Sequence, residues 1–271
     1  MFFVLFLALI VRLAILPKLT LAWDEVMHVH LGEVFIGNIL AGNFNGNDYA
    51  LHPTHPGFVR LLFGIYLYLG SLLYPLNLQV VSLTNIQVAR LVSVTFGVLG
   101  CLGVYLYSRL LFKSNLIGVV SAIVLAFDPF FLYYSTIAYL DVPCAVLILY
   151  SLLCFYLGIK SKSLKYLTLS GIFFGLGSAS KYPAFFALPV ILIWTIYVLL
   201  RKALAGRRAA DITEQQFKEM RKQLDKTRLF GTYSFFFGLM FPAVWLGTSV
   251  LAFVAGNPFL WTDTVSHFFF Q

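Results

Sequence analysis

The chain has 271 residues, of which 60% are hydrophobic and 11% are charged. A soluble domain has about 45–50% apolar and about 25% charged residues, so an ordinary soluble enzyme, a disordered segment, a collagen and a coiled coil are excluded. An integral membrane protein remains. The net charge is +8, but nine of the nineteen Lys and Arg residues lie between Arg201 and Arg228. The excess is therefore a property of one loop and does not indicate nucleic-acid binding.

Seven apolar runs of about 16–26 residues predict transmembrane helices, because each suits a hydrocarbon core roughly 30 Å thick. Lipid offers backbone polar groups no water, so each run is expected to be helical. The runs are Met1–Leu16, Leu91–Ser108, Leu116–Tyr134, Val142–Ile159, Leu164–Ser180, Tyr182–Leu200 and Phe230–Ala255. The predicted fold class is all-α, a polytopic membrane protein with about seven transmembrane helices.

An eighth apolar segment, Gly57–Tyr74, decides the topology. Loops rich in Lys and Arg stay in the cytoplasm, and seven crossings place 14 of the 19 basic residues on one side. We therefore expect Gly57–Tyr74 to be a juxtamembrane helix that does not cross. Residues 1–271 then form a single transmembrane module with an extracytoplasmic first loop at 17–87 and a basic cytoplasmic loop at 201–229. A further outer loop begins at 256–271, where the module is either truncated or minimal.

Two adjacent acidic residues, Asp24 and Glu25, follow the first run. Carboxylates at a membrane surface are costly unless they have a function, such as a general base or a metal ligand. The alternative is an N-cap, with Asp24 starting a helix through Leu40 and Glu25 favouring its dipole. His28 lies four residues after Asp24, on the same helical face, where a plain structural hydrogen bond is the alternative to a functional role.

Prolines define two further segments. In Leu51-His-Pro-Thr-His-Pro-Gly57, two X-Pro steps hold the backbone extended and deliver His55 just before the juxtamembrane helix. The alternative is a rigid elbow that only sets the entry angle of that helix. Asp128 precedes Pro129 inside the third run, where it could cap a break in the helix.

Three charged residues mark the outer ends of apolar runs: Arg90, Asp141 and Lys181. Asp141 could be only an N-cap, and Lys181 could reach the lipid headgroups. Together with the acidic pair, however, they suit a lipid-linked anionic substrate. Arg90 and Lys181 would hold its phosphate, and a carboxylate would activate an incoming hydroxyl.

Five short motifs resemble the GT-C glycosyltransferases, and within them the protein O-mannosyltransferases and their relatives, including the aminoarabinose transferases of lipid A. Trp23-Asp-Glu-Val-Met-His28 is similar to the Asp-Glu motif of that family, and Thr54-His-Pro-Gly57 to its His-Pro-Pro element, with Gly57 in place of the second proline. The remaining motifs are Val88-Ala-Arg-Leu91, Leu140-Asp-Val-Pro143 and Gly175-Leu-Gly-Ser-Ala-Ser-Lys181. The resemblance implies a seven-helix GT-C module, a polyprenyl-phosphate sugar donor and inversion at the anomeric carbon. It also favours a non-crossing Gly57–Tyr74.

The sequence is therefore interpreted as a glycosyltransferase that moves a sugar from a polyprenyl-phosphate carrier to a hydroxyl of a protein, lipid or glycan. Its active site is expected on the extracytoplasmic face of the plasma membrane, or in the endoplasmic reticulum if the source is eukaryotic. Membrane lipids are expected partners and nucleic acids are not. The expected site residues are the general base Asp24 or Glu25, the phosphate ligands Arg90 and Lys181, and the supporting residues His55, Asp141 and His28.

Three questions stay open at this point. Asp24, Glu25 and Asp141 could supply hard oxygen ligands, so a divalent cation is left undecided. The first rival function is a transporter or lipid flippase, in which intramembrane charges would line a path. The second is a non-enzymatic membrane scaffold, in which the acidic residues merely cap helices.

Overall fold

The computed structural model describes residues 1–43, 55–73, 84–197, 200 and 241–257, and every regular element in these ranges is a helix. The predicted all-α class is therefore confirmed for this part of the chain. The labelled elements are α1 (Phe2–Ile15), η1 (Leu16–Lys18), α2 (Glu25–Ala41), α3 (Phe58–Leu73), α4 (Asn85–Phe112), α5 (Asn115–Phe127), α6 (Pro129–Tyr134), α7 (Asp141–Ser161), α8 (Leu164–Ser178) and η4 (Tyr182–Ala187). Two further apolar helices are Tyr182–Tyr197, which begins with η4, and Phe241–Ala255.

Two helices of the described ranges, α4 with 28 residues and α7 with 21, are long and apolar enough to cross a membrane. The other predicted runs contain shorter helices, such as α1 with 14 residues and α8 with 15. At 1.5 Å per residue, 15 residues reach about 22 Å, which is less than the roughly 30 Å hydrocarbon core. The count of seven spans is thus not confirmed and stays a proposal. The predicted loop at 201–229 and most of the one at 256–271 lie outside the described residues.

The third apolar run is broken at the position where the sequence allows a cap. The Asp128 carboxylate accepts a hydrogen bond of 2.7 Å from the backbone N–H of Phe131, and Pro129 occupies the first position of α6. Proline is tolerated there because its missing N–H would have no helical partner. The prediction that Asp128 caps a helix break is confirmed.

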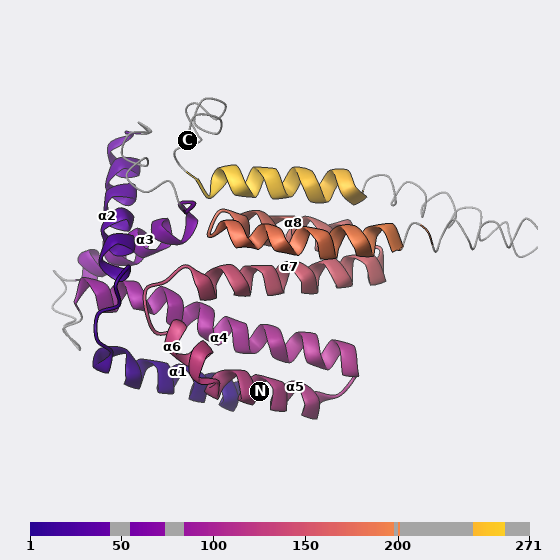
Figure 1. The fold of residues 1–271 in the computed structure, drawn as a ribbon, viewed down its shortest axis with the longest axis horizontal. Helices are drawn as coiled ribbons and strands as arrows, with labels where there is room; N and C mark the ends of the chain where they lie inside the picture. Colours follow the sequence, from indigo (N-terminus) through magenta and orange to yellow (C-terminus); the bar gives the residue numbers. More distant parts are fainter. Residues whose placement is uncertain (44–54, 74–83, 198–199, 201–240, 258–271) are drawn as a thin grey trace, which may run out of the picture.

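The arrangement of the helices resembles a bundle whose one end is covered. Figure 1 shows α1, α4, α5, α7, α8 and the helix Phe241–Ala255 running along the long axis of the molecule, whereas α2 crosses one end of them. α3 packs against both α2 and α4. Gly32 of α2 and Gly64 of α3 allow this approach, because a Cβ on Gly32 would lie 2.9 Å from the backbone nitrogen of Gly64. The end where α4 and α7 begin is therefore covered by α2 and α3.

The contacts of α3 support the prediction that Gly57–Tyr74 does not cross the membrane. The backbone N–H of Phe58, at the start of α3, donates to the carbonyl of Ala179 at the end of α8, at 2.9 Å. Near the other end of α3, a Cβ on Gly70 would lie 3.5 Å from Val88, in the first turn of α4. Because α8 ends and α4 begins at the same end of the bundle (Figure 1), both ends of α3 lie at that end.

This topology predicts the labelling of single cysteines in intact cells. Trp23→Cys and Asn85→Cys should both react with an impermeant thiol reagent from outside, because a non-crossing α3 leaves both positions on the outer face. Ser161→Cys, at the opposite end of α7, should be protected. Asn85→Cys is the matched control, because it lies outside in either topology. If Trp23→Cys were protected together with Ser161→Cys, α3 would have to cross.

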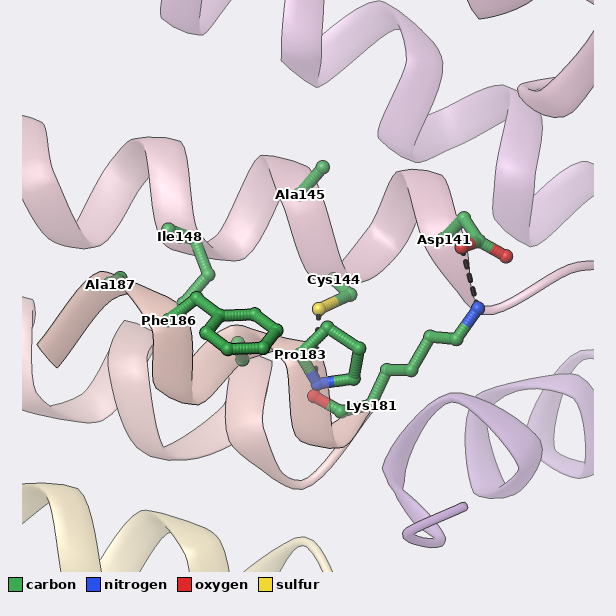
Figure 2. A pocket seen from close by; sticks show the side chains of 9 residues that line it. Asp141, Cys144, Ala145, Ile148, Lys181, Pro183, Phe186 and Ala187 are labelled. Carbon is green, nitrogen blue, oxygen red and sulfur yellow. Dashed lines mark hydrogen bonds and ion pairs between the residues drawn. The ribbon is translucent and has the colours of Figure 1, made fainter. Parts of the chain in front are cut away.

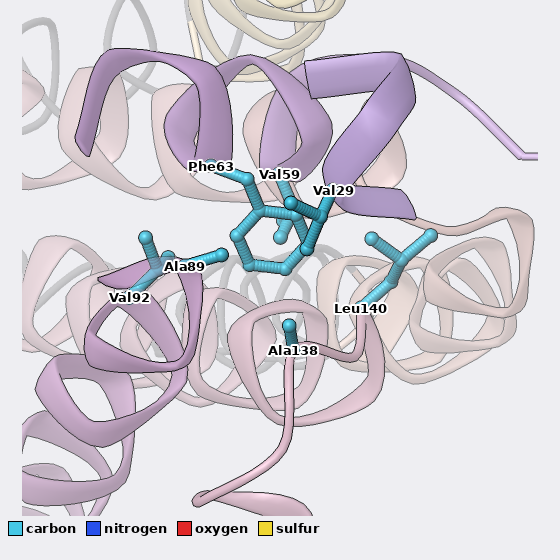
Figure 3. Packing of buried hydrophobic residues seen from close by; sticks show 7 residues of the cluster. All are labelled: Val29, Val59, Phe63, Ala89, Val92, Ala138 and Leu140. Atoms are coloured by element: carbon cyan, nitrogen blue, oxygen red, sulfur yellow. The ribbon is translucent and has the colours of Figure 1, made fainter. Parts of the chain in front are cut away.

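A buried cluster at the covered end joins the segment before α7 to three helices. Ala138 and Leu140 of that segment are buried and pack with residues of α2, α3 and α4 (Figure 3), which are Val29, Val59, Phe63, Ala89 and Val92. The intervening Tyr139 and the following Asp141 are partly exposed. Two side chains thus anchor this segment in the core, and the side chains of the other two remain available to the surface.

Candidate functional site

A buried ion pair joins α2 to α4 at the covered end. The Nε and Nη2 atoms of Arg90 each donate to the carboxylate of Glu25 at 2.7 Å, and both side chains are at least 97% buried. The start of α4 is fixed by a capping box, in which Thr84 accepts from the backbone N–H of Gln87 and Gln87 accepts from that of Thr84. This cap lies less than two turns before Arg90 and helps to set its position.

Every N–H of the Arg90 guanidinium has a protein acceptor. Besides Glu25, it donates to the backbone carbonyls of Leu16 at 3.0 Å, Leu19 at 3.2 Å and Thr20 at 3.0 Å. A guanidinium has five N–H groups, and these contacts use all of them. Arg90 therefore closes the loop between α1 and α2 in this structure, instead of facing an open site as a free phosphate ligand.

The carboxylate of Glu25 is also fully hydrogen-bonded within the protein. Its two oxygens also accept the backbone N–H groups of Ala138 at 2.7 Å and Ala22 at 2.9 Å. Burial alone would raise the pKa of the Glu25 carboxyl, but the hydrogen bonds from Arg90, Ala138 and Ala22 outweigh it and hold the pKa below its ordinary value. A carboxylate that is fully hydrogen-bonded and hard to protonate is a poor general base. The structure thus gives both Glu25 and Arg90 internal partners.

Asp24 has a different environment, although it is adjacent in sequence. It occupies the N-cap position of α2, but its side chain makes no capping hydrogen bond. The side chain is half-buried, and the neighbouring Trp23 is 95% exposed. Its backbone N–H donates to the hydroxyl of Tyr139 at 3.4 Å. Of the acidic pair, Asp24 is therefore the carboxylate that solvent or a substrate can reach.

The two predicted histidines lie near each other, and Tyr139 lies beside His28. The ring centroids of His28 and His55 are 6.1 Å apart, and the ring of Tyr139 lies 6.0 Å from that of His28 in an edge-on arrangement. Arg60 connects them from α3, since its Nε donates to Nδ1 of His28 at 3.4 Å and its Nη1 to the carbonyl of His55 at 3.0 Å. Burial lowers the pKa of Arg60 to about 10.

Arg60 and Tyr139 were not among the predicted site residues. A sequence signal for Arg60 existed, because it is the only charged residue in the apolar segment Gly57–Tyr74. Such a charge is usually functional or paired. Tyr139 directly precedes the Leu140-Asp-Val-Pro143 motif but has no distinguishing pattern of its own.

A second ion pair lies at the mouth of an apolar cavity. Nζ of Lys181, in the turn after α8, lies 2.6 Å from a carboxylate oxygen of Asp141 at the start of α7. The Lys181 side chain is 24% exposed and that of Asp141 is 45% exposed. Figure 2 shows Lys181 reaching to Asp141, with Cys144, Pro183 and Phe186 beside it. The cavity has a volume of about 430 Å³, and its other lining residues are Ala145, Ile148, Ala184 and Ala187.

The segment from Ala138 to Asp141 connects the two ion pairs. Ala138 donates to Glu25, Tyr139 contacts Asp24, and Asp141 binds Lys181. Consecutive Cα atoms are 3.8 Å apart, so Tyr139 and Asp141 are separated by at most about 7.6 Å. The half-buried Asp24 and the cation Lys181 are thus held at the same end of the bundle by neighbouring residues of one short segment.

The carboxylates considered for a metal do not gather around one point in the described ranges. No group of three or more His, Cys, Asp and Glu side chains able to hold an ion is found among the residues that the structure describes. Glu25 and Asp141 each have a cationic partner, Arg90 and Lys181. Metal dependence therefore receives no support from the positions of these side chains.

The comparisons with known proteins bear on this site. The sequence model of the dolichyl-phosphate-mannose-protein mannosyltransferase family matches residues 69–210, which is more than half of the chain. The chain belongs to this family. No curated protein and no solved structure matched it.

Membership of this family identifies a mannosyltransferase-type glycosyltransferase, and neither rival function receives comparable support. The matched residues include Arg90, Asp141 and Lys181. Asp24 and His55 precede them, so their assignment depends on the geometry described above. The family is membrane-associated, and its name refers to a dolichyl-phosphate sugar. This agrees with the apolar helices of the chain.

Proposed function

We propose that the chain transfers a sugar from a polyprenyl-phosphate-linked donor to an acceptor hydroxyl of a protein, lipid or glycan at the extracytoplasmic membrane surface, with inversion at the anomeric carbon. The observation that carries this proposal is the segment 138–141, whose residues contact the half-buried Asp24 and the cation Lys181 at one end of an apolar helical bundle. Family membership supports the same reaction class.

In this mechanism Asp24 is the general base. The acceptor oxygen attacks C1 of the sugar and forms the new glycosidic bond, while its proton passes to the Asp24 carboxylate. The bond between C1 and the phosphate oxygen breaks, and polyprenyl phosphate leaves with the electron pair. Glu25 takes no proton in this scheme. Its pair with Arg90 instead fixes the start of α2, and so the position of the adjacent Asp24.

Lys181 is the proposed contact for the donor phosphate. The phosphate would compete with the Asp141 carboxylate for Nζ of Lys181, and a preorganised cation stabilises the charge that develops as phosphate leaves. Residues such as Cys144, Ile148 and Phe186 line the cavity beside this cation. An apolar cavity next to a cation suits the first isoprene units of the carrier together with its phosphate.

The role of Lys181 predicts a donor-specific defect. Lys181→Gln should raise the KM for the polyprenyl-phosphate sugar at least tenfold, because the bound donor phosphate would lose its ion pair with Lys181. Loss of one partner of such a desolvated pair costs about 2–5 kcal/mol. The measurement is the rate of sugar transfer by purified protein as a function of donor concentration. Lys165→Gln is the matched control, since Lys165 is exposed at the first turn of α8, at the opposite end from the site. An unchanged donor KM in Lys181→Gln would remove Lys181 from the phosphate site.

A further inference from the structure

Two backbone N–H groups of the elbow at residues 55–58 donate hydrogen bonds to distant parts of the chain. The N–H of Gly57 donates to Oδ1 of Asn257 at 2.8 Å. The next N–H, of Phe58, donates to the carbonyl of Ala179 at 2.9 Å. His55 lies two residues before the first of these bonds, and Lys181 lies two residues after the acceptor of the second. One elbow therefore connects His55, the turn that carries Lys181, and Asn257.

The side-chain amide of Asn257 is held in one orientation, with Oδ1 as the acceptor for Gly57. Its side chain is fully buried, its Nδ2 donates to the carbonyl of Phe253 at 2.7 Å, and its backbone N–H donates to the carbonyl of Val254 at 3.0 Å. These contacts tie the residue to the end of the helix Phe241–Ala255. Because the side-chain amide nitrogen of Asn257 donates to the carbonyl of Phe253, its amide oxygen is directed to the N–H of Gly57.

The helix that carries Asn257 packs closely on α8, beside which it runs in Figure 1. A Cβ on Gly171 would lie 2.6 Å from the carbonyl oxygen of Trp245, and a Cβ on Gly175 would collide with the carbonyl of Ser249. At the end of this contact, a Cβ on Gly256 would lie 2.8 Å from Cβ of Ala179. Such spacings leave the helix little freedom to shift, so Asn257 is a rigid attachment for the elbow.

Glycine at position 57 has a specific consequence for this attachment. The family element that the segment resembles has proline here, and proline has no N–H to donate. In this chain the N–H of Gly57 is present, and a buried amide oxygen receives it. The hydrogen bond between Gly57 and Asn257 is thus available to this chain because of its departure from the His-Pro-Pro pattern.

We infer that Asn257 is a positioning residue of the donor site. Through Gly57 and the Phe58–Ala179 bond it fixes the elbow, and thereby the distance of His55 and of the Lys181 turn from the carboxylate of Asp24. It touches no substrate and acts through the elbow. This inference rests on the proposed function, since it assigns the helix Phe241–Ala255 to the scaffold of the same site.

The test measures donor KM and thermal stability for Asn257→Ala, Gly57→Pro and the double variant. Asn257→Ala removes the partners of the Gly57 N–H and of the Phe253 carbonyl, and Gly57→Pro removes the donor to Oδ1 of Asn257. Each single variant should therefore lose stability and show a donor KM raised about tenfold, the upper end of what one hydrogen bond contributes. The double variant removes both the Gly57 N–H and the Asn257 oxygen and still lacks the donor to the Phe253 carbonyl, so its stability should recover in part relative to the single variants. Its donor KM should stay raised, because the elbow is still detached.

Ser151→Ala is the control for stability alone. Ser151 is buried, donates to the carbonyl of Ser170 at 2.9 Å between α7 and α8, and belongs to neither ion pair. It should lose stability and keep the wild-type KM. A wild-type KM in Asn257→Ala, or a KM that recovers together with stability in the double variant, would overturn the inference. Failure of the wild-type protein to transfer sugar would instead contradict the proposed function.

Discussion

Asp24→Asn should abolish most sugar transfer while leaving the protein folded and able to bind donor. The substitution keeps the size of the side chain but removes its basicity, and loss of a general base typically costs about 10²–10⁴-fold in rate. Loss of an N-cap would cost only about 1 kcal/mol of stability, and in this structure the Asp24 side chain makes no capping bond to lose. The measurement is kcat for transfer at saturating donor, with donor KM determined in parallel.

Glu33→Gln is the matched control for Asp24→Asn. Glu33 lies on the same helix, α2, with its side chain 43% exposed, and it accepts a hydrogen bond from the side chain of Asn85 at 3.0 Å. Its neutralisation should leave kcat within about threefold, as expected of an exposed surface group. If Asp24→Asn transferred sugar at the wild-type rate, the catalytic role of Asp24 would be wrong.

Separating the buried pair should produce the largest loss of stability. Arg90→Met leaves the Glu25 carboxylate buried without its cation, and breaking such a pair by removing one partner costs about 3–5 kcal/mol. Glu25→Gln should also destabilise, because the uncompensated charge of Arg90 then remains buried. The measurement is thermal or denaturant unfolding of the purified protein in detergent. Lys181→Gln breaks the partly exposed pair and should cost less than about 1 kcal/mol.

The sign of the pH dependence follows from the pKa of Glu25. Because the folded protein holds this pKa below its ordinary value, ionised Glu25 stabilises the fold at pH values above the unfolded pKa of about 4.3. That contribution is lost as the pH falls through the folded pKa. Wild-type stability should therefore decrease in acid more steeply than that of Glu25→Gln. If Arg90→Met and wild type were equally stable at neutral pH, the Glu25–Arg90 pair would not stabilise the fold.

Local features of this chain were predictable because they depend on neighbours in sequence. Apolar runs predicted helices, and Asp128 before Pro129 predicted the break between α5 and α6. The length of each helix was less predictable, because helices begin and end inside the apolar runs and hydropathy does not mark these positions. Tyr182–Leu200, for instance, begins with a 3-10 helix that contains Pro183. Apolar composition alone therefore did not determine the number of spanning helices.

The pairing of charged and buried polar groups could not be predicted, because it depends on tertiary contacts. Arg90 meets Glu25 across 65 residues, and Gly57 meets Asn257 across 200. Sequence placed all these charges at the outer face, and the structure does bring Asp24, His55, Asp141 and Lys181 to one end of the bundle. The sequence could not indicate that Arg90 and Glu25 neutralise each other there, because it showed only that both residues lie near predicted helix ends.

Sugar transfer by the purified wild-type protein is the decisive measurement of this function. The protein is incubated in lipid vesicles with polyprenyl-phosphate mannose, labelled in the sugar, and with peptide, lipid and glycan acceptors. We predict that label moves to one class of acceptor hydroxyl, that polyprenyl phosphate is released in equal amount, and that the new bond has the inverted anomeric configuration. Movement of intact labelled donor across the bilayer, with no label on any acceptor, would exclude this transferase function and favour a lipid flippase.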